Sequence, residues 1–313
     1  MKKIKLAYFG SPDFAANFLE KILTDKDLFR LIEVRLVVTQ PDKKVGRKQI
    51  LTPTPVKKVA EKYQKSENTF FEIIARGPLG GVAVEKNGIE LTNIDLALVY
   101  AYSDLIPNEL FTLPKYGFWN IHPSLLPKYR GPSPMATALI NGDKKTGITI
   151  IKMDEEIDHG PIIAQESLTI KDNDKRPYLE KKLTNLAYKM FKEIMGKIPT
   201  GDKKFRSEPF IAQNHKLATY TKKLSKQDGF IEFKKIKNAL IPSPYSLTVY
   251  NLFRGLYPWP GLWTLLPNGR RLKITGLNIV RNKNLCSLQI KRVQLEGKKE
   301  VDFETFNKAY KIF

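Results

Sequence analysis

The sequence predicts two domains, an α/β domain built on a Rossmann-like parallel sheet and a small OB-like β-barrel domain after it. Apolar runs compatible with strands alternate with helical segments through about the first 200 residues, as in a parallel α/β sheet. An irregular, Lys-rich stretch comes next, and short β-like runs with turn signals follow it, as in a small barrel. We therefore expect a first domain at 1–201, a linker at 202–218 and a basic β-barrel domain at 219–313.

The individual elements are predicted from hydrophobic pattern and from turn signals. The apolar run 4–9 is expected to be a buried strand, and Ser11 is expected to cap a helix whose first position is Pro12. Helices are expected at 14–23, 56–62, 133–140 and 179–194. Further strands of the sheet are expected at 34–39, 96–100, 118–122 and 147–153. The β-like runs of the barrel are expected at 229–233, 262–265, 271–274 and 287–293.

The ligand site of an open α/β sheet lies at the carboxyl ends of its strands. Gly10, Gln40, Ser103 and His122 are expected at that edge. The turn after the first strand has a single glycine where a dinucleotide-binding loop needs three spaced glycines, and the sequence contains no Gly-x-x-x-x-Gly-Lys-Ser/Thr loop. A Rossmann-like sheet in this chain therefore does not imply NAD or ATP.

The charge of the chain indicates a polyanionic partner. Lysine and arginine total 53 against 32 aspartates and glutamates, a net charge of +21. From residue 201 onward there are 22 basic and 8 acidic residues, so +14 of that charge lies in the last part of the chain. A basic surface of this size favours a nucleic acid, although a generally Lys-rich proteome would also raise the charge.

The sequence also bears on the cellular compartment. The apolar run near the start breaks within about seven residues, below the usual length of a signal-peptide core. No apolar stretch approaches the roughly 18–20 residues that a membrane helix needs. Cys286 is the single cysteine, so no internal disulfide can form. We expect a cytoplasmic protein without a membrane partner.

Asn120 and His122 are the first candidates for chemistry. They are two residues apart on the predicted strand 118–122, so their side chains are expected on one face at its carboxyl end. An amide and an imidazole placed in this way can act on one small group. An Asn-x-His pair is more often part of a hydrogen-bonded core, so the pair alone is weak evidence for catalysis and leaves both interpretations open.

Two further segments add to this pair. The loop PSLLPKYRGPSP at 123–134 is framed by prolines, which restrict the backbone and suit the binding of a flat ligand. Asp158 stands in the acidic run 153–160, whose other carboxylates are expected to be solvated. Together with Asn120 and His122, these segments resemble the signature of the 10-formyltetrahydrofolate-dependent formyltransferases.

The resemblance implies a one-carbon transfer with 10-formyltetrahydrofolate as the formyl donor. Asn120 and His122 would stabilise the formyl oxygen, and Asp158 would set the ionisation of His122 and move protons through water. Four residues are implied to contact the folate, namely Ser124, Leu125, Leu126 and Pro127. His159 matches no catalytic position of the family, and the few candidate ligands lack metal-binding spacing, so no metal is expected.

The acceptor is indicated by regions outside this core. The stretch 39–57 resembles the basic loop with which the tRNA-specific branch of the family engages the acceptor end of tRNA. Its residues implied to bind tRNA are Lys43, Lys44, Arg47 and Lys48. The stretches 218–231 and 253–261 resemble the C-terminal barrel of the same branch. The resemblance therefore implies transfer to the free amino group of methionyl-initiator tRNA, for translation initiation. Separately, we expect the protein to be a monomer.

Two other functions stay open at this point. The chain could be a sugar-nucleotide N-formyltransferase with a basic appendage, or a tRNA-binding protein that has lost catalysis. Purine formyltransferases resemble the first domain alone, so the basic second domain separates them from this chain. The presence of Asn120, His122 and Asp158 argues against lost catalysis.

The chain departs from the family pattern at three places. Ser103 stands where the family usually has glycine, the stretch 67–91 matches poorly, and the barrel is short between 279 and 287. These departures bear on packing and tRNA affinity more than on the chemistry.

Overall fold

The computed structural model describes residues 2–46, 48–64, 71–75, 91–198, 210–281 and 285–313. The chain forms two compact units. The first consists of Met1–Arg130, Gly147–Leu168 and Lys181–Tyr220. The second consists of Gly131–Thr146, Thr169–Glu180 and Thr221–Phe313. The domain boundaries expected from the sequence stay a prediction, and the first part of the expected linker lies outside the described residues.

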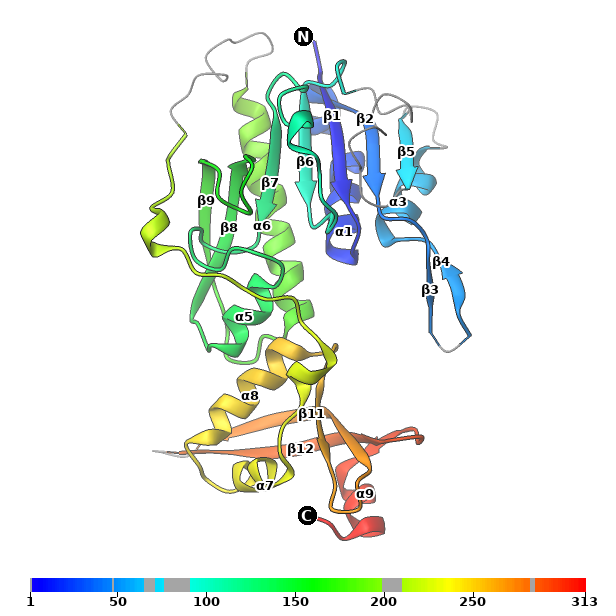
Figure 1. The fold of residues 1–313 in the computed structure, drawn as a ribbon, viewed down its shortest axis with the longest axis vertical. Coiled ribbons are helices and arrows are strands. Elements are labelled where there is room, and N and C mark those ends of the chain that lie inside the picture. The colour runs from blue at the N-terminus through cyan, green and yellow to red at the C-terminus, as the bar shows by residue number, and fades with distance from the viewer. Residues whose placement is uncertain (1, 47, 65–70, 76–90, 199–209, 282–284) are drawn as a thin grey trace. The chain divides into compact units, whose positions relative to one another are not determined.

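The first unit is built around a sheet with the strand order β5-β2-β1-β6-β7-β8-β9 (Figure 1). The strands are β1 (Ile4–Gly10), β2 (Ile32–Thr39), β5 (Glu72–Ala75), β6 (Leu96–Tyr100), β7 (Phe118–His122), β8 (Lys145–Lys152) and β9 (Ile162–Thr169). The pairings from β5 to β7 are parallel, which confirms the predicted α/β architecture. The strand expected at 147–153 is present as β8 and runs antiparallel to β7, so the sheet is mostly parallel.

Aromatic side chains hold the layers of this unit together. The helices are α1 (Asp13–Thr24), α2 (Lys26–Leu31), α3 (Pro55–Gln64) and the greater part of α6 (Arg176–Lys197). Phe18 of α1 packs edge-on against Tyr100 of β6 and Phe191 of α6, at centroid distances of 5.5 and 5.8 Å. On the other face of the sheet, Phe9 and Phe111 pack against Phe118 of β7. Since adjacent strand residues point to opposite faces, the apolar runs are buried on both sides.

The connection between β1 and α1 corrects one expectation. The helix begins at Asp13, Pro12 occupies the N-cap position, and Ser11 does not cap it. The hydroxyl of Ser11 instead accepts from the backbone N–H of Gln40, at 3.2 Å, and donates to the carbonyl of Tyr102, at 3.3 Å. Ser11 therefore links the carboxyl ends of β1, β2 and β6, a role that a local capping pattern does not predict.

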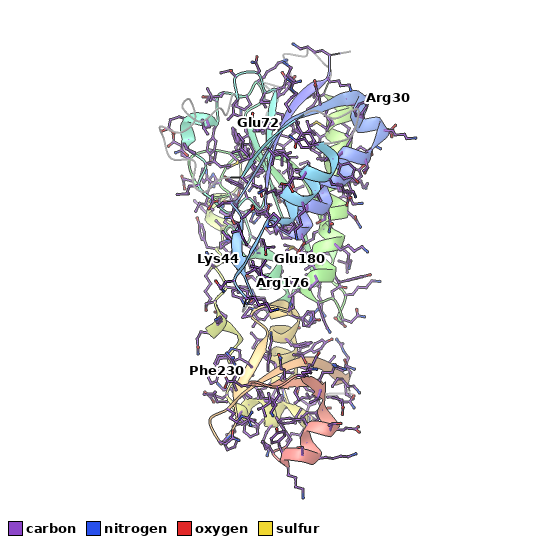
Figure 2. The ribbon with its side chains drawn as sticks, turned by 90° about the vertical axis from the view of Figure 1, so that its right-hand side faces the viewer. Arg30, Lys44, Glu72, Arg176, Glu180 and Phe230 are labelled. Carbon is purple, nitrogen blue, oxygen red and sulfur yellow. The ribbon has the colours of Figure 1, made fainter. Side chains whose placement is uncertain are left out.

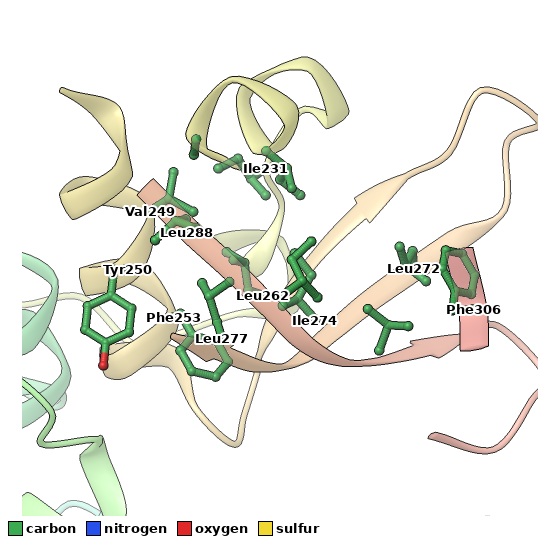
Figure 3. Close-up of a cluster of buried hydrophobic side chains, with 14 of the residues drawn as sticks. Ile231, Val249, Tyr250, Phe253, Leu262, Leu272, Ile274, Leu277, Leu288 and Phe306 are labelled. Carbon is green, nitrogen blue, oxygen red and sulfur yellow. The ribbon is translucent and has the colours of Figure 1, made fainter. Parts of the chain in front are cut away.

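The second unit, for which the sequence predicts a small OB-like β-barrel, contains an antiparallel sheet in the order β10-β11-β12-β13. Its strands are β10 (Leu262–Leu265), β11 (Arg271–Arg281), β12 (Cys286–Leu295) and β13 (Glu300–Asp302). Its helices are α5 (Pro134–Ile140), α7 (Phe233–Leu240), α8 (Tyr245–Leu256) and α9 (Phe303–Tyr310). Figure 3 shows the buried side chains between this sheet and its helices, including Val249, Phe253 and Leu277.

The strand expected at 229–233 is absent from the described part of the second unit. A 3-10 helix covers Lys226–Gly229, α7 begins at Phe233, and Phe230 alone makes an isolated bridge to Trp263. The backbone approaches closely here, because a Cβ on Gly229 would lie 2.0 Å from the carbonyl oxygen of Gly261. Ile236 and Ala239, three residues apart, bury one face of α7, and this spacing is helical.

The structure explains why glycine is usual at the position of Ser103. The φ angle of Ser103 is +69°, in the left-handed region, and its side chain is exposed. In the folded state, a residue with a side chain costs about 1–2 kcal/mol at such an angle, relative to ordinary backbone angles. Glycine avoids that cost, but its greater freedom in the unfolded chain makes folding about 0.5–1 kcal/mol less favourable. Glycine is therefore the better residue at this turn on the carboxyl side of β6.

We expect Ser103→Gly to raise the free energy of unfolding by roughly 0.5–1 kcal/mol, because relief of the left-handed angle exceeds the added entropy. Denaturant titration of the full chain measures the change. Ser167→Gly is the matched control, since Ser167 is exposed within β9 and is not among the residues with positive φ. The control is expected to lose about 0.5–1 kcal/mol. A loss of stability in Ser103→Gly contradicts the backbone explanation.

Candidate active site

The carboxyl end of β7 brings together the three predicted catalytic residues. The carboxylate Oδ1 of Asp158 lies 2.9 Å from Nδ2 of Asn120 and 3.3 Å from Nδ1 of His122. His122 is 4% exposed, so the imidazole meets the carboxylate largely away from water. One oxygen therefore contacts both the amide and the ring, as the same-face spacing on the strand predicts.

The second nitrogen of His122 is also engaged. Its Nε2 lies 2.8 Å from the carbonyl oxygen of Tyr129. A carbonyl oxygen can only accept, so Nε2 carries a proton and Nδ1 is the nitrogen that faces Asp158. Nδ1 is thus the ring position at which a proton can pass to or from the carboxylate. The amide of Asn120 has two hydrogens, so it can donate to Asp158 and to a reacting oxygen at once.

The loop that carries Asp158 has an unusual backbone. The φ angle of Asp158 is +50°, a left-handed conformation that few residues other than glycine adopt. Two residues later, a Cβ on Gly160 would lie 1.8 Å from the carbonyl oxygen of Lys152. Any side chain at 160 would therefore push the loop away from β8. The glycine of the Ile-Asp-His-Gly motif is explained by this close approach, and it fixes where Asp158 stands.

The predicted folate-binding segment, Ser124 to Pro127, forms the loop directly after β7. Its backbone is tied to β8, because Oγ1 of Thr149 donates to the carbonyl of Ser124 at 2.7 Å and accepts from the N–H of Leu126 at 3.1 Å. Gln165 of β9 donates to the carbonyl of Leu126 at 2.9 Å. The Leu126–Pro127 peptide is cis. The loop is thus fixed by its neighbours, as its prolines predict.

Side chains within the folate-binding segment differ in exposure. Ser124 is 1% exposed, and its hydroxyl donates to the carbonyl of Lys128 at 2.6 Å. Leu126 is buried, while Leu125 and Pro127 are half-buried. Leu125 also lies against β8, where a Cβ on Gly147 would be 2.5 Å from its Cδ2. Any contact that Ser124 makes with a ligand therefore competes with bonds inside the loop.

Four residues that the sequence did not single out support this site. Thr149 and Gln165 hold the folate-binding segment, Gln213 contacts the loop of Asp158, and Arg130 contacts Gln213. The guanidinium of Arg130 is buried and donates to Oε1 of Gln213 at 2.8 Å. These contacts join residues that are far apart in sequence, so a local pattern could not have found them. For Arg130 alone, its place before Gly131 in the loop 123–134 was the available sequence signal.

Three of the predicted tRNA-binding residues lie on the hairpin of β3 (Lys43–Val45) and β4 (Ile50–Thr52), which Figure 1 shows apart from β7. Lys43, Lys44 and Lys48 are exposed, and Arg47 lies outside the described residues. Figure 1 shows the hairpin extending beyond the carboxyl edge of the sheet, and Figure 2 labels Lys44 on it. Apolar side chains are exposed on it as well, with Ile50 at 60% and Leu51 at 62%.

Metal-binding clusters and membrane-spanning helices are both missing from the described residues. Among the residues that the structure describes, no group of three or more histidine, cysteine, aspartate or glutamate side chains could hold a metal ion. No helix in the described parts of the chain is both long and apolar enough to span a bilayer.

Comparison with known proteins identifies the family. The formyl transferase model matches residues 2–195, and the model of the formyl transferase C-terminal domain matches residues 223–287. Together they span most of the chain, including the cluster of Asn120, His122 and Asp158. The chain belongs to the formyl transferase family.

Similar proteins of this family come from several bacteria. The chain is 34% identical to the methionyl-tRNA formyltransferase of Caldicellulosiruptor saccharolyticus, over 98% of this chain and 97% of that protein. It is 38% identical to the methionyl-tRNA formyltransferase of Kosmotoga olearia, over 89% of this chain and 81% of that protein.

Solved structures share the fold at lower identity. A 4-N formyltransferase from Francisella tularensis aligns with a TM-score of 0.60 and 20% identity, over 87% of this chain and 96% of that one. An N-formyltransferase from Helicobacter canadensis, in complex with folinic acid and dTDP-3-aminofucose, aligns with a TM-score of 0.58 and 20% identity, over 89% of each chain.

Replacing any member of the cluster is expected to reduce turnover in a folded protein. Asn120 is predicted to donate to the developing oxyanion, and on that prediction Asn120→Ala is expected to lower kcat by about 100- to 1000-fold. His122→Ala and Asp158→Ala are expected to lower it severely as well. Single-turnover formylation and thermal melting of each variant provide the measurements.

Asn108→Ala is the matched control for these replacements, because Asn108 is an exposed amide of the first unit. It is expected to keep the parent rate. The competing interpretation is a buried histidine that only supports the fold, whose loss lowers stability by about 1–3 kcal/mol. If His122→Ala melts well below the parent and still formylates normally when folded, the residue is structural.

Proposed function

We propose that this protein transfers a formyl group from 10-formyltetrahydrofolate to the free amino group of methionyl-initiator tRNA, in the cytoplasm, for translation initiation. One observation carries the proposal: the contact of Asp158 with both Asn120 and His122, in a chain that aligns over 98% of its length with a methionyl-tRNA formyltransferase. The geometry supports the reaction, and the alignment supports the acceptor. We expect a monomer without a metal or a membrane partner.

The proposed reaction is an acyl transfer without a covalent enzyme intermediate. The amine nitrogen attacks the formyl carbon, a C–N bond forms, and the carbonyl electrons move to the formyl oxygen. The amide hydrogen of Asn120 that does not bond to Asp158 donates to that oxygen, and His122 is proposed to help stabilise it. The proton lost by the amine passes through Nδ1 of His122, or a water, toward Asp158. The carbonyl bond then re-forms as the bond to the folate nitrogen breaks, and that nitrogen takes up the proton held by Asp158, directly or through a water.

The folate is proposed to lie along the loop after β7. Hydrogen bonds between the side chains of Thr149 and Gln165 and the loop backbone hold Ser124 to Pro127 in place before a ligand arrives, which limits the ordering needed on binding. The related Helicobacter canadensis structure contains folinic acid, which supports a folate donor for this fold. The donor reaches the cluster because this loop begins directly after His122.

The tRNA acceptor is proposed to use the hairpin and the basic C-terminal part. Exposed Lys43, Lys44 and Lys48 supply positive charge on the hairpin, and the chain from 201 onward carries a balance of +14. Lysines that meet phosphates release counterions, so such contacts raise affinity for any polyanion. Exposed Ile50 and Leu51 offer apolar surface to an unstacked base.

A sugar-nucleotide acceptor is the second candidate, because the Helicobacter canadensis complex contains dTDP-3-aminofucose. Its identity to this chain is 20%, against 34% and 38% for the two methionyl-tRNA formyltransferases. The basic C-terminal part would bind the phosphates of tRNA, whereas a small acceptor gives so basic a part no comparable role.

Incubation with 10-formyltetrahydrofolate and either methionyl-initiator tRNA or dTDP-3-aminofucose tests the proposal. Mass spectrometry then reports which acceptor gains a formyl group. The proposal requires formyl-methionine released from the tRNA, at a rate far above that of the sugar. Formylation of the sugar alone, or of neither acceptor, rules it out.

The hairpin yields a separate prediction. Lys43→Ala with Lys44→Ala is expected to raise the KM for tRNA and leave the KM for the formyl donor unchanged, because the hairpin is remote from Ser124 to Pro127. The dependence of tRNA binding on salt is expected to weaken by about 1 unit of log–log slope for each phosphate that the variant no longer touches. Steady-state kinetics and binding titrations over a range of salt measure both effects.

Lys26→Ala is the control for the loss of charge, because Lys26 is exposed on α2 of the same unit. It removes one positive charge away from the hairpin and is expected to leave the salt slope unchanged. An equal effect for each charge removed in the hairpin and control variants would show that net charge, rather than the hairpin, determines tRNA binding.

A further inference from the structure

Gln213 contacts the loop of Asp158 at two points. It lies in the described segment 210–220 of the first unit and is 5% exposed. Its Nε2 donates to the carbonyl of Asp158, at 2.9 Å, and to the carbonyl of Gly160, at 2.8 Å. Both amide hydrogens of the side chain are therefore used on a single short loop.

Those two hydrogen bonds span the left-handed turn. Asp158 has a φ angle of +50°, which non-glycine residues adopt when neighbouring structure holds them there. Gly160 fixes the loop against Lys152 from one side, and Gln213 holds the carbonyls before and after His159 from the other. The direction of the Asp158 carboxylate depends on this backbone.

The same segment also holds the partner of His122. Oε1 of Gln213 accepts from Nη2 of Arg130, at 2.8 Å. The backbone N–H of Arg130 donates to the carbonyl of Thr219, at 2.8 Å, and the N–H of Tyr129 donates to Oγ1 of Thr219, at 2.9 Å. The carbonyl of Tyr129 is the group that meets Nε2 of His122. One stretch of chain thus fixes both the carboxylate and the imidazole.

We infer that Gln213 is a positioning residue for formyl transfer, which sets the Asp158 carboxylate against Asn120 and His122. The inference rests on the proposed function, because it needs those three residues to be catalytic. A small displacement of a reacting group can slow a reaction by about 100-fold, so a residue that never touches substrate can still affect kcat.

The test is Gln213→Glu in the full chain. This variant keeps the length of the side chain and an oxygen for Arg130, but an ionised carboxylate cannot donate to the two carbonyls. We expect kcat to fall by about 10- to 100-fold, with the KM for donor and tRNA within about threefold of the parent. Circular dichroism checks that the variant is folded.

Gln64→Glu is the matched control, because Nε2 of Gln64 also donates to a backbone carbonyl, that of Phe71, at 2.7 Å. It makes the same chemical change at the end of α3 and is expected to keep the parent kcat. If Gln213→Glu does not fold, Gln213→Met replaces it, since it is neutral and similar in length. If the chain folds with neither substitution, Gln213 is needed for folding and the positioning role is overturned.

A double-mutant cycle with Asp158→Ala shows whether Gln213 acts through Asp158. If it does, Gln213→Glu has no further effect in the Asp158→Ala background. The inference is overturned if the losses in kcat from Gln213→Glu and Asp158→Ala multiply in the double variant. It is also overturned if Gln213→Glu folds and keeps the parent kcat. If the parent does not formylate tRNA, or His122→Ala formylates normally, the proposed function itself fails. If the parent is active and His122→Ala is impaired, the proposed function stands, and a negative result with Gln213→Glu then counts against the positioning role of Gln213 alone.

Discussion

A single carboxylate oxygen determines the arrangement of this site. Oδ1 of Asp158 lies within hydrogen-bond reach of Asn120 and close to Nδ1 of His122, although Asp158 is 36 residues after His122 in sequence. An amide donor and a proton-accepting pair can then act on the same carbonyl group, which is what amine formylation needs. The rest of the first unit can be understood as the means of holding that oxygen in place.

Two features of the sheet deliver this contact. The parallel strands β1, β2, β6 and β7 end at one edge, so the side chains of Asn120 and His122 reach it together. β8 then runs antiparallel to β7, and the loop after it folds back to bring Asp158 to the pair. Gly160 makes that return possible, because the loop passes too close to Lys152 for any side chain. The strained angle at Asp158 follows from the tightness of the return.

Much of this could be predicted from the sequence. The period-2 spacing places Asn120 and His122 on one face, and the apolar runs locate most strands of the sheet. Long-range hydrogen bonds escape such a prediction, because nothing local to Gln213 reveals that it meets the carbonyl of Asp158. Ser11 has the pattern of a helix cap, yet its hydroxyl forms hydrogen bonds that link the ends of three strands instead. In the second unit, the start of α7 is predicted as part of a strand because its short apolar run fits either period.

The central claim is that Asn120, His122 and Asp158 act as one unit on one transition state. The most direct measurement is the single-turnover formylation rate of a variant that lacks all three side chains, compared with the three single replacements. Residues that act together lose most of their effect with the first removal, so the account predicts a triple variant about as slow as the slowest single one. Losses that multiply from one replacement to the next would contradict it.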